Sequence, residues 1–197
     1  MLTTSTARAM SFSEAMRNVD AGAAFVDLRD VASYLDVHIP GSLSLLYESG
    51  PGFPSRARDL IPLDLPLVLM TREDADMDNA AAALRGRGFS VLGQVPDAVN
   101  EWSRWLGAPA STETYQGPRP RRGRLLDVGD PGAAAVNEAD AIPIPQLWAR
   151  AGELDDGSGI TVIAGYGVRA ALAVGILERA GLDGIVFWQS RDPRSRA

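Results

Sequence analysis

The chain has 197 residues, a formal net charge of −6, no cysteine, no lysine and a single histidine, His38. These counts exclude disulfides, thiolate nucleophiles, Schiff bases, lysine-dependent phosphate loops and multi-histidine metal sites, so we expect no cofactor and no metal. The acidic balance disfavours nucleic acid, and no apolar run reaches the length of a membrane span, so a cytoplasmic location is the default expectation.

The first half alternates predicted helices and apolar strands. A helix is expected over residues 11–19, capped by Ser11 with Glu14 three positions on, and an apolar strand over 23–28 follows it. The next expected elements are a short helix at 31–35, a turn at 38–42, a loop at 50–54, a strand at 66–70, a polar loop at 71–76, a helix at 79–87 and a strand at 90–92. This order predicts right-handed crossovers and a parallel sheet.

The same order returns in the second half. The expected elements there are strands at 124–128 and 160–163, a loop at 164–168, a helix at 170–180 and a last strand at 185–188. Thr71 corresponds to Ala164, and Gly88 to Gly181, at an offset of 93 residues, whereas Asp27 corresponds to Asp127 at an offset of 100. A deletion of seven residues in the later copy explains the difference.

We therefore predict an α/β protein with two domains in tandem, each a central parallel sheet flanked by helices on both faces. The first domain is expected at residues 1–107 and a compact second domain at 123–197. The segment between them, 108–122, is rich in Pro, Ser, Thr and Gly and is predicted to be a linker.

One segment carries a family resemblance. Asp27 and Arg29 are followed by the aromatic Tyr34 and by the run His38-Ile-Pro-Gly41-Ser. This spacing closely resembles the pattern of the rhodanese (sulfurtransferase) family. The two copies together are also similar to the C-terminal rhodanese pair of metallo-β-lactamase-fold, persulfide-dioxygenase-like fusions.

The resemblance implies a catalytic cysteine at the end of the second strand of each copy, held by a ring of backbone N–H groups. Its thiolate would accept a sulfane sulfur as a persulfide. Here the two positions are Thr71 and Ala164, and neither side chain can form a persulfide. We therefore expect no catalytic residue of the family type.

The two loops at these positions differ in charge. The first loop contains Glu73, Asp74 and Asp76 and should repel an oxyanion. The second loop consists of Gly165, Tyr166, Gly167, Val168 and Arg169, and its backbone amides with the guanidinium could bind a small oxyanion. In the alternative interpretation the glycines only permit a tight turn and Arg169 pairs with a nearby carboxylate.

The remaining residues of the motif, two tryptophans and a cluster of arginines are assigned structural roles. Asp27 and Arg29 are expected to form an ion pair that fixes the turn, and Asp127 is the counterpart of Asp27. His38 and Gly41 are interpreted as turn residues, with His38 as a base the alternative. Trp102 and Trp105 are expected to cover the core, and a basic cluster is assigned to a solvated linker: Arg119, Arg121, Arg122 and Arg124.

Three functions remain open from the sequence. The first is a non-catalytic binding or regulatory module of sulfide or persulfide metabolism, which would serve a metallo-β-lactamase-fold sulfur enzyme as a protein partner or sense a small oxyanion. The second is an active thiosulfate sulfurtransferase, which the family name alone suggests. The third is a hydrolase that uses Thr71 with Asp74 or Asp76.

Overall fold

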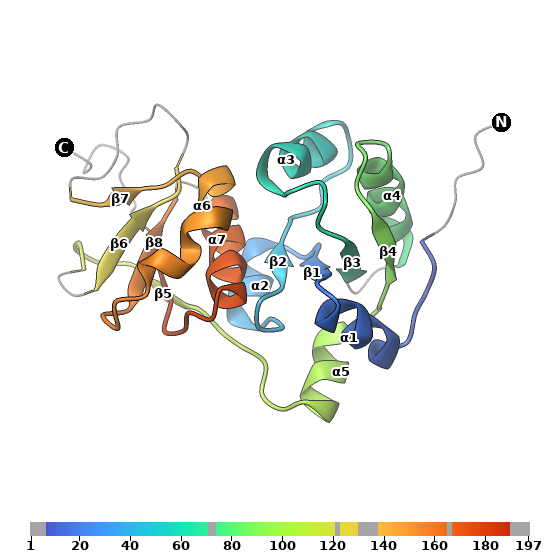
Figure 1. Cartoon of the computed structure of the whole chain (residues 1–197), viewed down its shortest axis with the longest axis horizontal. Helices are drawn as coiled ribbons and strands as arrows, with labels where there is room; N and C mark the ends of the chain where they lie inside the picture. Colours follow the sequence, from blue (N-terminus) through green and yellow to red (C-terminus); the bar gives the residue numbers. More distant parts are fainter. Residues whose placement is uncertain (1–6, 71–73, 121–122, 130–137, 165–166, 190–197) are drawn as a thin grey trace.

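A computed structural model describes residues 7–70, 74–120, 123–129, 138–164 and 167–189. Two parallel β-sheets lie on opposite sides of one central helix, α7 (Figure 1). None of the helices in these ranges is long and apolar enough to cross a bilayer.

The first half contains a four-stranded parallel sheet in the order β2-β1-β3-β4. Its elements are α1 (Phe12–Asp20), β1 (Ala24–Asp27), α2 (Val31–Asp36), β2 (Leu43–Ser44), α3 (Gly52–Leu60), β3 (Leu67–Met70), α4 (Asp74–Arg85), β4 (Val91–Gln94) and α5 (Ala98–Trp105). An isolated parallel bridge joins Ala9 to Gln94, so the segment at Ala9 lies in the position of a fifth strand beside β4.

The second half contains a five-stranded parallel sheet in the order β5-β9-β8-β6-β7. Its elements are β5 (Glu113–Tyr115), β6 (Arg124–Asp127), β7 (Asp140–Ala141), α6 (Ile144–Arg150), the 3₁₀ helix η1 (Ala151–Leu154), β8 (Ile160–Ile163), α7 (Val168–Arg179) and β9 (Val186–Trp188). With the Ala9 segment counted, the two sheets have the same strand order, which supports an α/β unit repeated in tandem.

The strand register confirms the two offsets between the copies. Asp27 lies opposite Met70 in the first sheet, and Asp127 lies opposite Ile163 in the second. Ala164 follows Ile163 at the carboxyl end of β8, and Thr71 follows Met70 in the sequence but lies outside the described residues. The register thus agrees with the predicted correspondence of positions 71 and 164.

Local sequence explains where several elements begin. Ser11 caps α1 by accepting a hydrogen bond from the Glu14 N–H at 3.2 Å, and Asp30 caps α2 by accepting one from the Ser33 N–H at 2.9 Å. Every residue of β1, β3 and β8 is buried. Their continuous apolar runs fit parallel strands that are covered on both faces.

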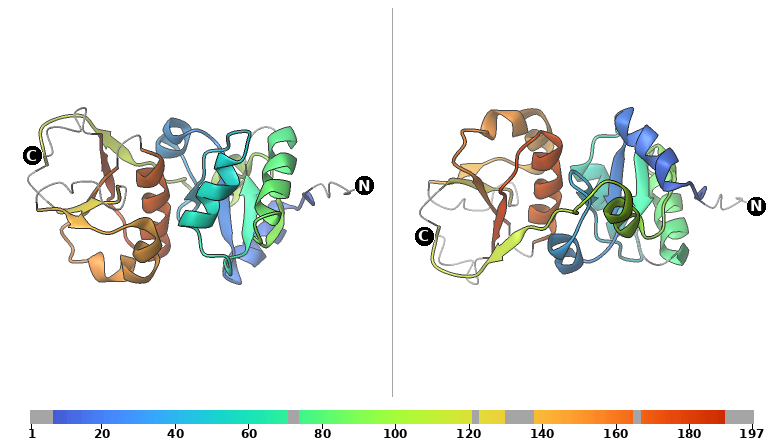
Figure 2. Two further views of the ribbon diagram at one scale, coloured as in Figure 1. Left: turned by 90° about the horizontal axis from the view of Figure 1, so that it is seen from above. Right: turned by 90° about the horizontal axis from the view of Figure 1, so that it is seen from below.

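The largest core includes residues of both halves, and α7 is its centre. All eight residues from Ala170 to Leu177 are buried, and α7 packs against β2, α2 and α6 (Figure 2). Gly175 permits the close approach, because a Cβ atom there would lie only 1.9 Å from the Ser42 carbonyl oxygen.

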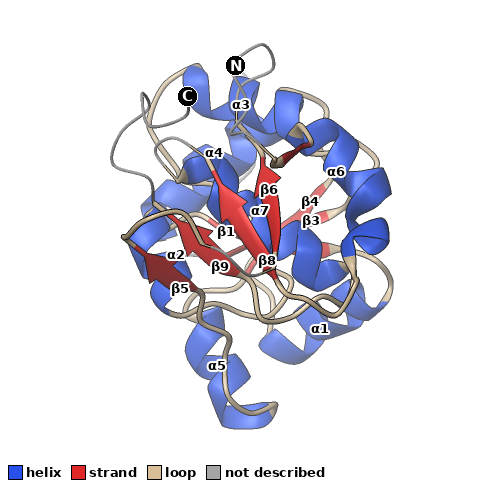
Figure 3. Ribbon diagram, turned by 90° about the vertical axis from the view of Figure 1, so that its left-hand side faces the viewer, coloured by secondary structure: helices blue, strands red, loops and turns tan. Residues whose placement is uncertain are grey.

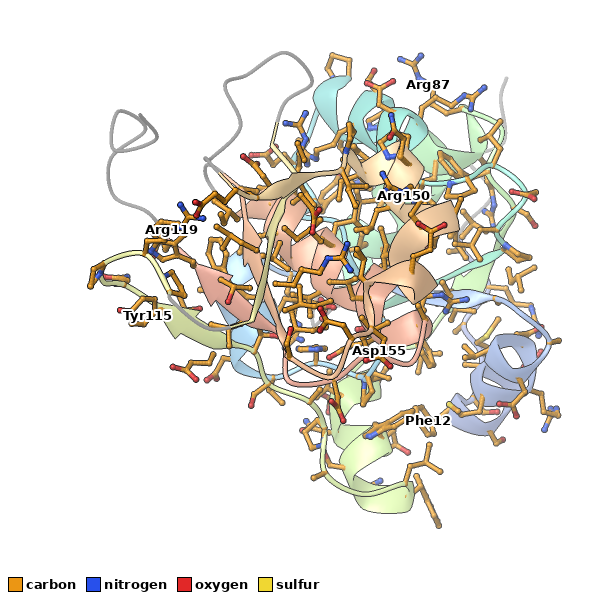
Figure 4. The ribbon with its side chains drawn as sticks, turned by 60° about the vertical axis from the view of Figure 1, so that its left-hand side comes forward. Phe12, Arg87, Tyr115, Arg119, Arg150 and Asp155 are labelled. Carbon is orange, nitrogen blue, oxygen red and sulfur yellow. The ribbon has the colours of Figure 1, made fainter. Side chains whose placement is uncertain are left out.

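The remaining faces of the sheets are covered differently. The second face of the first sheet carries α1 and α5, and Phe12 of α1 stacks on Phe25 of β1 (Figure 4). The second face of the other sheet has a small cluster around Leu125, Ile163 and Trp188, to which no described helix contributes. Figure 3 views the molecule from this side, with α5 projecting from the body.

Four expectations require correction. The expected loop at 50–54 runs into α3, because burial of Phe53 and Ala57 outweighs the turn signals of Gly52 and Pro54. The expected helix at 79–87 begins earlier and ends earlier, as α4 (Asp74–Arg85), so part of the predicted polar loop is helical. The expected linker contains β5, which pairs in parallel with β9.

The fourth correction concerns α5. Trp102 is partly buried against the core, but Trp105 is 69% exposed and covers nothing in the described chain. The indole N–H of Trp105 donates to Glu101 at 3.1 Å on the same helix. The expectation is therefore confirmed for Trp102 and wrong for Trp105.

Candidate functional site

The carboxyl ends of the strands bring the candidate residues to equivalent edges of the two sheets. Ala164 is 4% exposed and belongs to the large core. Thr71, Glu73, Gly165 and Tyr166 lie outside the described residues, as do the side chains of Asp74 and Asp76. The position at the end of β8 therefore holds a buried methyl group.

Asp27 and Arg29 form an ion pair at the carboxyl end of β1. The Arg29 Nε lies 2.9 Å and 3.1 Å from the two carboxylate oxygens of Asp27, and Nη2 lies 2.6 Å from Oδ2 and 2.7 Å from the Val37 carbonyl oxygen. Burial alone would lower the pKa of the guanidinium, but the hydrogen bonds and charge of Asp27 raise it above its usual value. The pair thus ties the end of β1 to the end of α2.

The second copy keeps only part of this arrangement. Asp127 is buried and accepts a hydrogen bond from the Gly129 N–H at 2.9 Å, as Asp27 does from the Arg29 N–H at 3.0 Å. Glycine stands where the first copy has arginine. The backbone turn is therefore shared by both copies, whereas the guanidinium belongs to the first.

His38 lies at the boundary between the two halves and is fully buried. Its Nδ1 is 2.8 Å from the Tyr34 carbonyl oxygen, and its Nε2 is 3.0 Å from Glu178 Oε1 on α7. Glu178 Oε2 accepts a hydrogen bond from the Gly41 N–H at 2.7 Å. Both ring nitrogens are thus engaged, and the segment containing His38 and Gly41 is fastened to α7.

Tyr34 completes this cluster. Its ring stacks on that of His38 with 4.3 Å between centroids, and its hydroxyl donates to the Ser42 carbonyl oxygen at 2.7 Å. Burial raises the pKa of the Tyr34 phenol well above its usual value, with the nearby charge of Glu178 adding to the effect. No sequence pattern indicated Glu178, because its contacts join residues that are 137 and 140 positions apart in the chain.

The described part of the second loop forms a tight turn into α7. Gly167 has a φ of +87°, which favours glycine, and its N–H donates to the Ala164 carbonyl oxygen at 3.2 Å. A Cβ at Gly167 would lie 3.3 Å from Phe187 and 3.4 Å from Val31 of the first half. Val168 and Arg169 form the first turn of α7.

Two arginines of the predicted basic cluster, Arg119 and Arg124, are described by the structure, and Arg124 is the first residue of β6. Arg119 pairs with Glu138 at 3.1 Å, and Arg124 pairs with Asp140 at 2.6 Å; Arg119 and Tyr115 are labelled in Figure 4. Arg121 and Arg122 lie outside the described residues. In the described ranges no group of three or more His, Cys, Asp or Glu side chains could hold a metal ion.

A cavity of about 100 Å³ opens at the carboxyl edge of the first sheet. Arg29, Met70 and Val99 line it, together with Asp97 at the start of α5. Sequence reasoning missed the contribution of α5, because residues 97–103 meet Arg29 only through the tertiary fold.

Comparison with known proteins defines the class. The chain is 35% identical over 98 residues to the thiosulfate sulfurtransferase GlpE of Pseudomonas savastanoi pv. phaseolicola, which covers 50% of this chain and 85% of GlpE. It is 38% identical over 88 residues to GlpE of Stutzerimonas stutzeri, which covers 45% of this chain and 75% of that protein. The chain therefore belongs to the rhodanese-like thiosulfate sulfurtransferase family.

Solved structures with similar folds are more distant. The 3-mercaptopyruvate sulfurtransferase SseA of Escherichia coli aligns with a TM-score of 0.42 at 15% identity, covering 93% of this chain and 98% of SseA. A thiosulfate sulfurtransferase from Pseudomonas aeruginosa gives 0.43 at 16% identity, covering 92% of this chain and 43% of that one. No family model matches the sequence.

Proposed function

We propose that this member of the sulfurtransferase family is a non-catalytic binding or regulatory module linked to sulfide or persulfide metabolism. The observation that carries the proposal is the residue at the end of β8, where the buried methyl group of Ala164 stands at the position equivalent to Thr71. Sulfur transfer through a persulfide needs a thiolate, and the chain has no cysteine.

The geometry of His38 supports the same proposal. A threonine hydroxyl at position 71 would need a general base to become a nucleophile. The only histidine is 0% exposed, and both of its nitrogens are engaged by the Tyr34 carbonyl oxygen and by Glu178. His38 therefore links the two halves structurally, through its contacts with Tyr34 and Glu178.

The partner we propose is a metallo-β-lactamase-fold sulfur enzyme that this chain serves in trans. The resemblance to the rhodanese pair of persulfide-dioxygenase-like fusions supports this choice. A pull-down with such an enzyme from the same organism, compared with a Trp105→Ser, Leu106→Ser double variant, tests it, because these are the large exposed apolar side chains of the described surface.

A finer proposal concerns the loop 165–169, which would bind a small oxyanion at the start of α7. The left-handed Gly167 and the guanidinium of Arg169 support it. Thermal unfolding with and without sulfate or phosphate, on the parent and on Arg169→Ala, tests it. The absence of anion-dependent stabilisation in the parent would refute oxyanion binding at this loop.

The test of the main proposal is an assay of sulfurtransferase activity. Purified protein with thiosulfate and cyanide should release no thiocyanate above a heat-killed control, whereas GlpE assayed in parallel should. Thr71→Cys is the matched variant, because it introduces a thiol at the cysteine position of the first copy without altering the core around Ala164. Release of thiocyanate by the unmodified protein would mean that it is an active sulfurtransferase, the alternative that the family name suggests.

A further inference from the structure

A groove of about 430 Å³ lies at the amino end of β9, on the opposite edge of the second sheet from Ala164. One wall is the segment 110–112, which leads into β5, and the other is the turn 181–185 between α7 and β9. Pro40 of the first half and Glu178 of α7 complete the lining. Small-molecule sites have volumes of about 300 to 1,000 Å³, so the groove is large enough for an organic ligand.

The groove exists because the chain that leads into β5 is held against the first half. Ala110 exchanges two backbone hydrogen bonds of 2.9 Å with His38. The Thr112 N–H donates to the Leu35 carbonyl oxygen at 2.7 Å. In such an extended segment the backbone groups of Ser111, between these two, point to the opposite side, toward the groove. They have no hydrogen-bond partner within the described part of the chain, so they are available to a ligand.

The charged groups that line the groove are acidic. The Glu178 side chain is 15% exposed, and its two oxygens engage His38 Nε2 at 3.0 Å and the Gly41 N–H at 2.7 Å. A carboxylate accepts up to about four hydrogen bonds, so Glu178 retains acceptor capacity. Asp183 is exposed at the rim, and the carboxyl end of α7 adds the negative end of a helix dipole. The groove therefore favours a positively charged group.

The arginine next to Glu178 does not line the groove. Arg179 Nη1 donates to the Ala23 carbonyl oxygen in the first half at 3.3 Å. Among the described residues that line the groove there is no arginine. A positively charged group bound there meets two carboxylates and no guanidinium.

The rest of the lining gives room for an apolar group. Leu182 and Ile185 are buried members of the large core, and each also lines the groove. Pro40 and Ala110 extend this apolar surface. Carboxylates beside apolar walls suit a molecule with one positive and one apolar end.

We propose that this groove binds a small organic cation, a primary ammonium group on a short apolar body. The ammonium group donates to the Glu178 carboxylate and to the Ser111 carbonyl oxygen, and the apolar body covers Leu182 and Ile185. A primary ammonium has three donors and no acceptor, which matches these acceptors. The inference concerns a site away from the cysteine-equivalent positions and does not depend on the proposed function.

The experiment is a titration of the full chain with three ligands of similar shape and different charge, followed by two-dimensional NMR near neutral pH. The cation 2-phenylethylammonium should give saturable shifts at residues 110–112 and 181–185, with a Kd of about millimolar order for a ligand of its size. The neutral 2-phenylethanol should bind at least fivefold more weakly, and the anion 3-phenylpropionate should give no saturable shifts there. Equal affinity for the cation and the alcohol, or shifts by the cation that do not saturate, would overturn the assignment.

Three variants and a control locate the site. Ser111→Phe, at an exposed position, should fill the groove and abolish the saturable shifts. Asp183→Asn should weaken binding of the cation about threefold and leave that of 2-phenylethanol unchanged, because it removes a negative charge from the rim. Glu178→Gln should weaken binding of the cation at least fivefold. Glu48→Gln is the control, because Glu48 is an exposed acid beyond the carboxyl end of β2, where it pairs with Arg56.

The outcomes decide between the groove and a general attraction of cations to an acidic protein. Circular dichroism confirms that each variant is folded before binding is compared, and if Glu178→Gln does not fold, the other two variants decide. Unchanged binding of the cation in folded Ser111→Phe, or equal losses in Asp183→Asn and Glu48→Gln, would refute the groove as the site. The thiocyanate assay tests the proposed function separately, and either result of it leaves this assignment standing.

Discussion

Because α7 packs closely against β2, we predict that Gly175→Ala lowers the free energy of unfolding, which is the opposite of the usual effect of this substitution in a helix. In the interior of a helix, replacing glycine by alanine ordinarily stabilises a protein by about 0.5 to 1 kcal/mol. In this structure the new Cβ would lie 1.9 Å from the Ser42 carbonyl oxygen, 2.9 Å from its carbonyl carbon and 3.0 Å from the Tyr34 hydroxyl oxygen. Two of these three atoms are backbone, so no rotamer change relieves the contact.

The magnitude follows from the distance that must be gained. A carbon and a carbonyl oxygen in contact are about 3.3 Å apart, so the two halves would have to separate by more than 1 Å at this point. Overpacking of this kind costs about 1 to 3 kcal/mol, and we expect the upper end because backbone meets backbone. For a chain of this size that corresponds to a melting temperature lower by about 6 to 12 °C.

Urea unfolding followed by tryptophan fluorescence and by circular dichroism measures the effect. Gly52→Ala is the matched control, because Gly52 is also helical and a Cβ there would meet nothing within 4 Å. The control should be as stable as the parent or slightly more stable. A Gly175→Ala variant with unchanged or increased free energy of unfolding would refute the described approach of α7 to β2.

Three further predictions concern the boundary and a helix cap. Glu178→Gln should lower the free energy of unfolding by about 1.5 to 3 kcal/mol in urea denaturation, because one carboxylate oxygen faces His38 Nε2 and the other accepts from the Gly41 N–H, and a glutamine amide has only one acceptor oxygen. An unchanged free energy would contradict the role of Glu178 in joining the two halves. Folding raises the pKa of the buried Tyr34 phenol, so the unfolded chain loses that proton first and stability falls as the pH rises above about 10. Tyr34→Phe should lower the free energy of unfolding by about 1 to 2 kcal/mol at neutral pH and make its fall above about pH 10 less steep, as measured by urea unfolding at a series of pH values. An equally steep fall in the variant would show that the Tyr34 phenol does not cause it. Hydrogen bonds from Ser33 lower the pKa of Asp30 in the folded protein, so the Asp30 carboxylate stabilises the fold above about pH 4, and this stabilisation is lost as the pH falls through the lowered pKa. Asp30→Ala should therefore cost about 1 kcal/mol at pH 7 and less at pH 2, measured by thermal unfolding at both pH values.

Much of the fold could be predicted from local patterns. Near-continuous apolar runs predict β1, β3 and β8, because a strand that is buried on both faces does not alternate apolar and polar residues. The offsets of 93 and 100 residues between the copies agree with the strand register. The ion pair of Asp27 with Arg29 also follows from a spacing of two residues.

Elements that depend on distant partners could not be predicted. The turn signals of residues 50–54 belong to the start of α3, and β5 lies in a segment whose composition is typical of a linker. Both are stabilised by burial or pairing with residues far away in the sequence, and no local pattern records such contacts.

The sequence by itself determined the repeated α/β unit and the absence of a thiol at either strand end, because strand periodicity and residue identity are local properties. Only the tertiary structure decided how the copies are joined: α7 lies between both sheets, Glu178 engages His38, and the start of α5 closes a cavity over Arg29. These features depend on the distances between segments that the chain brings together only when the whole core packs.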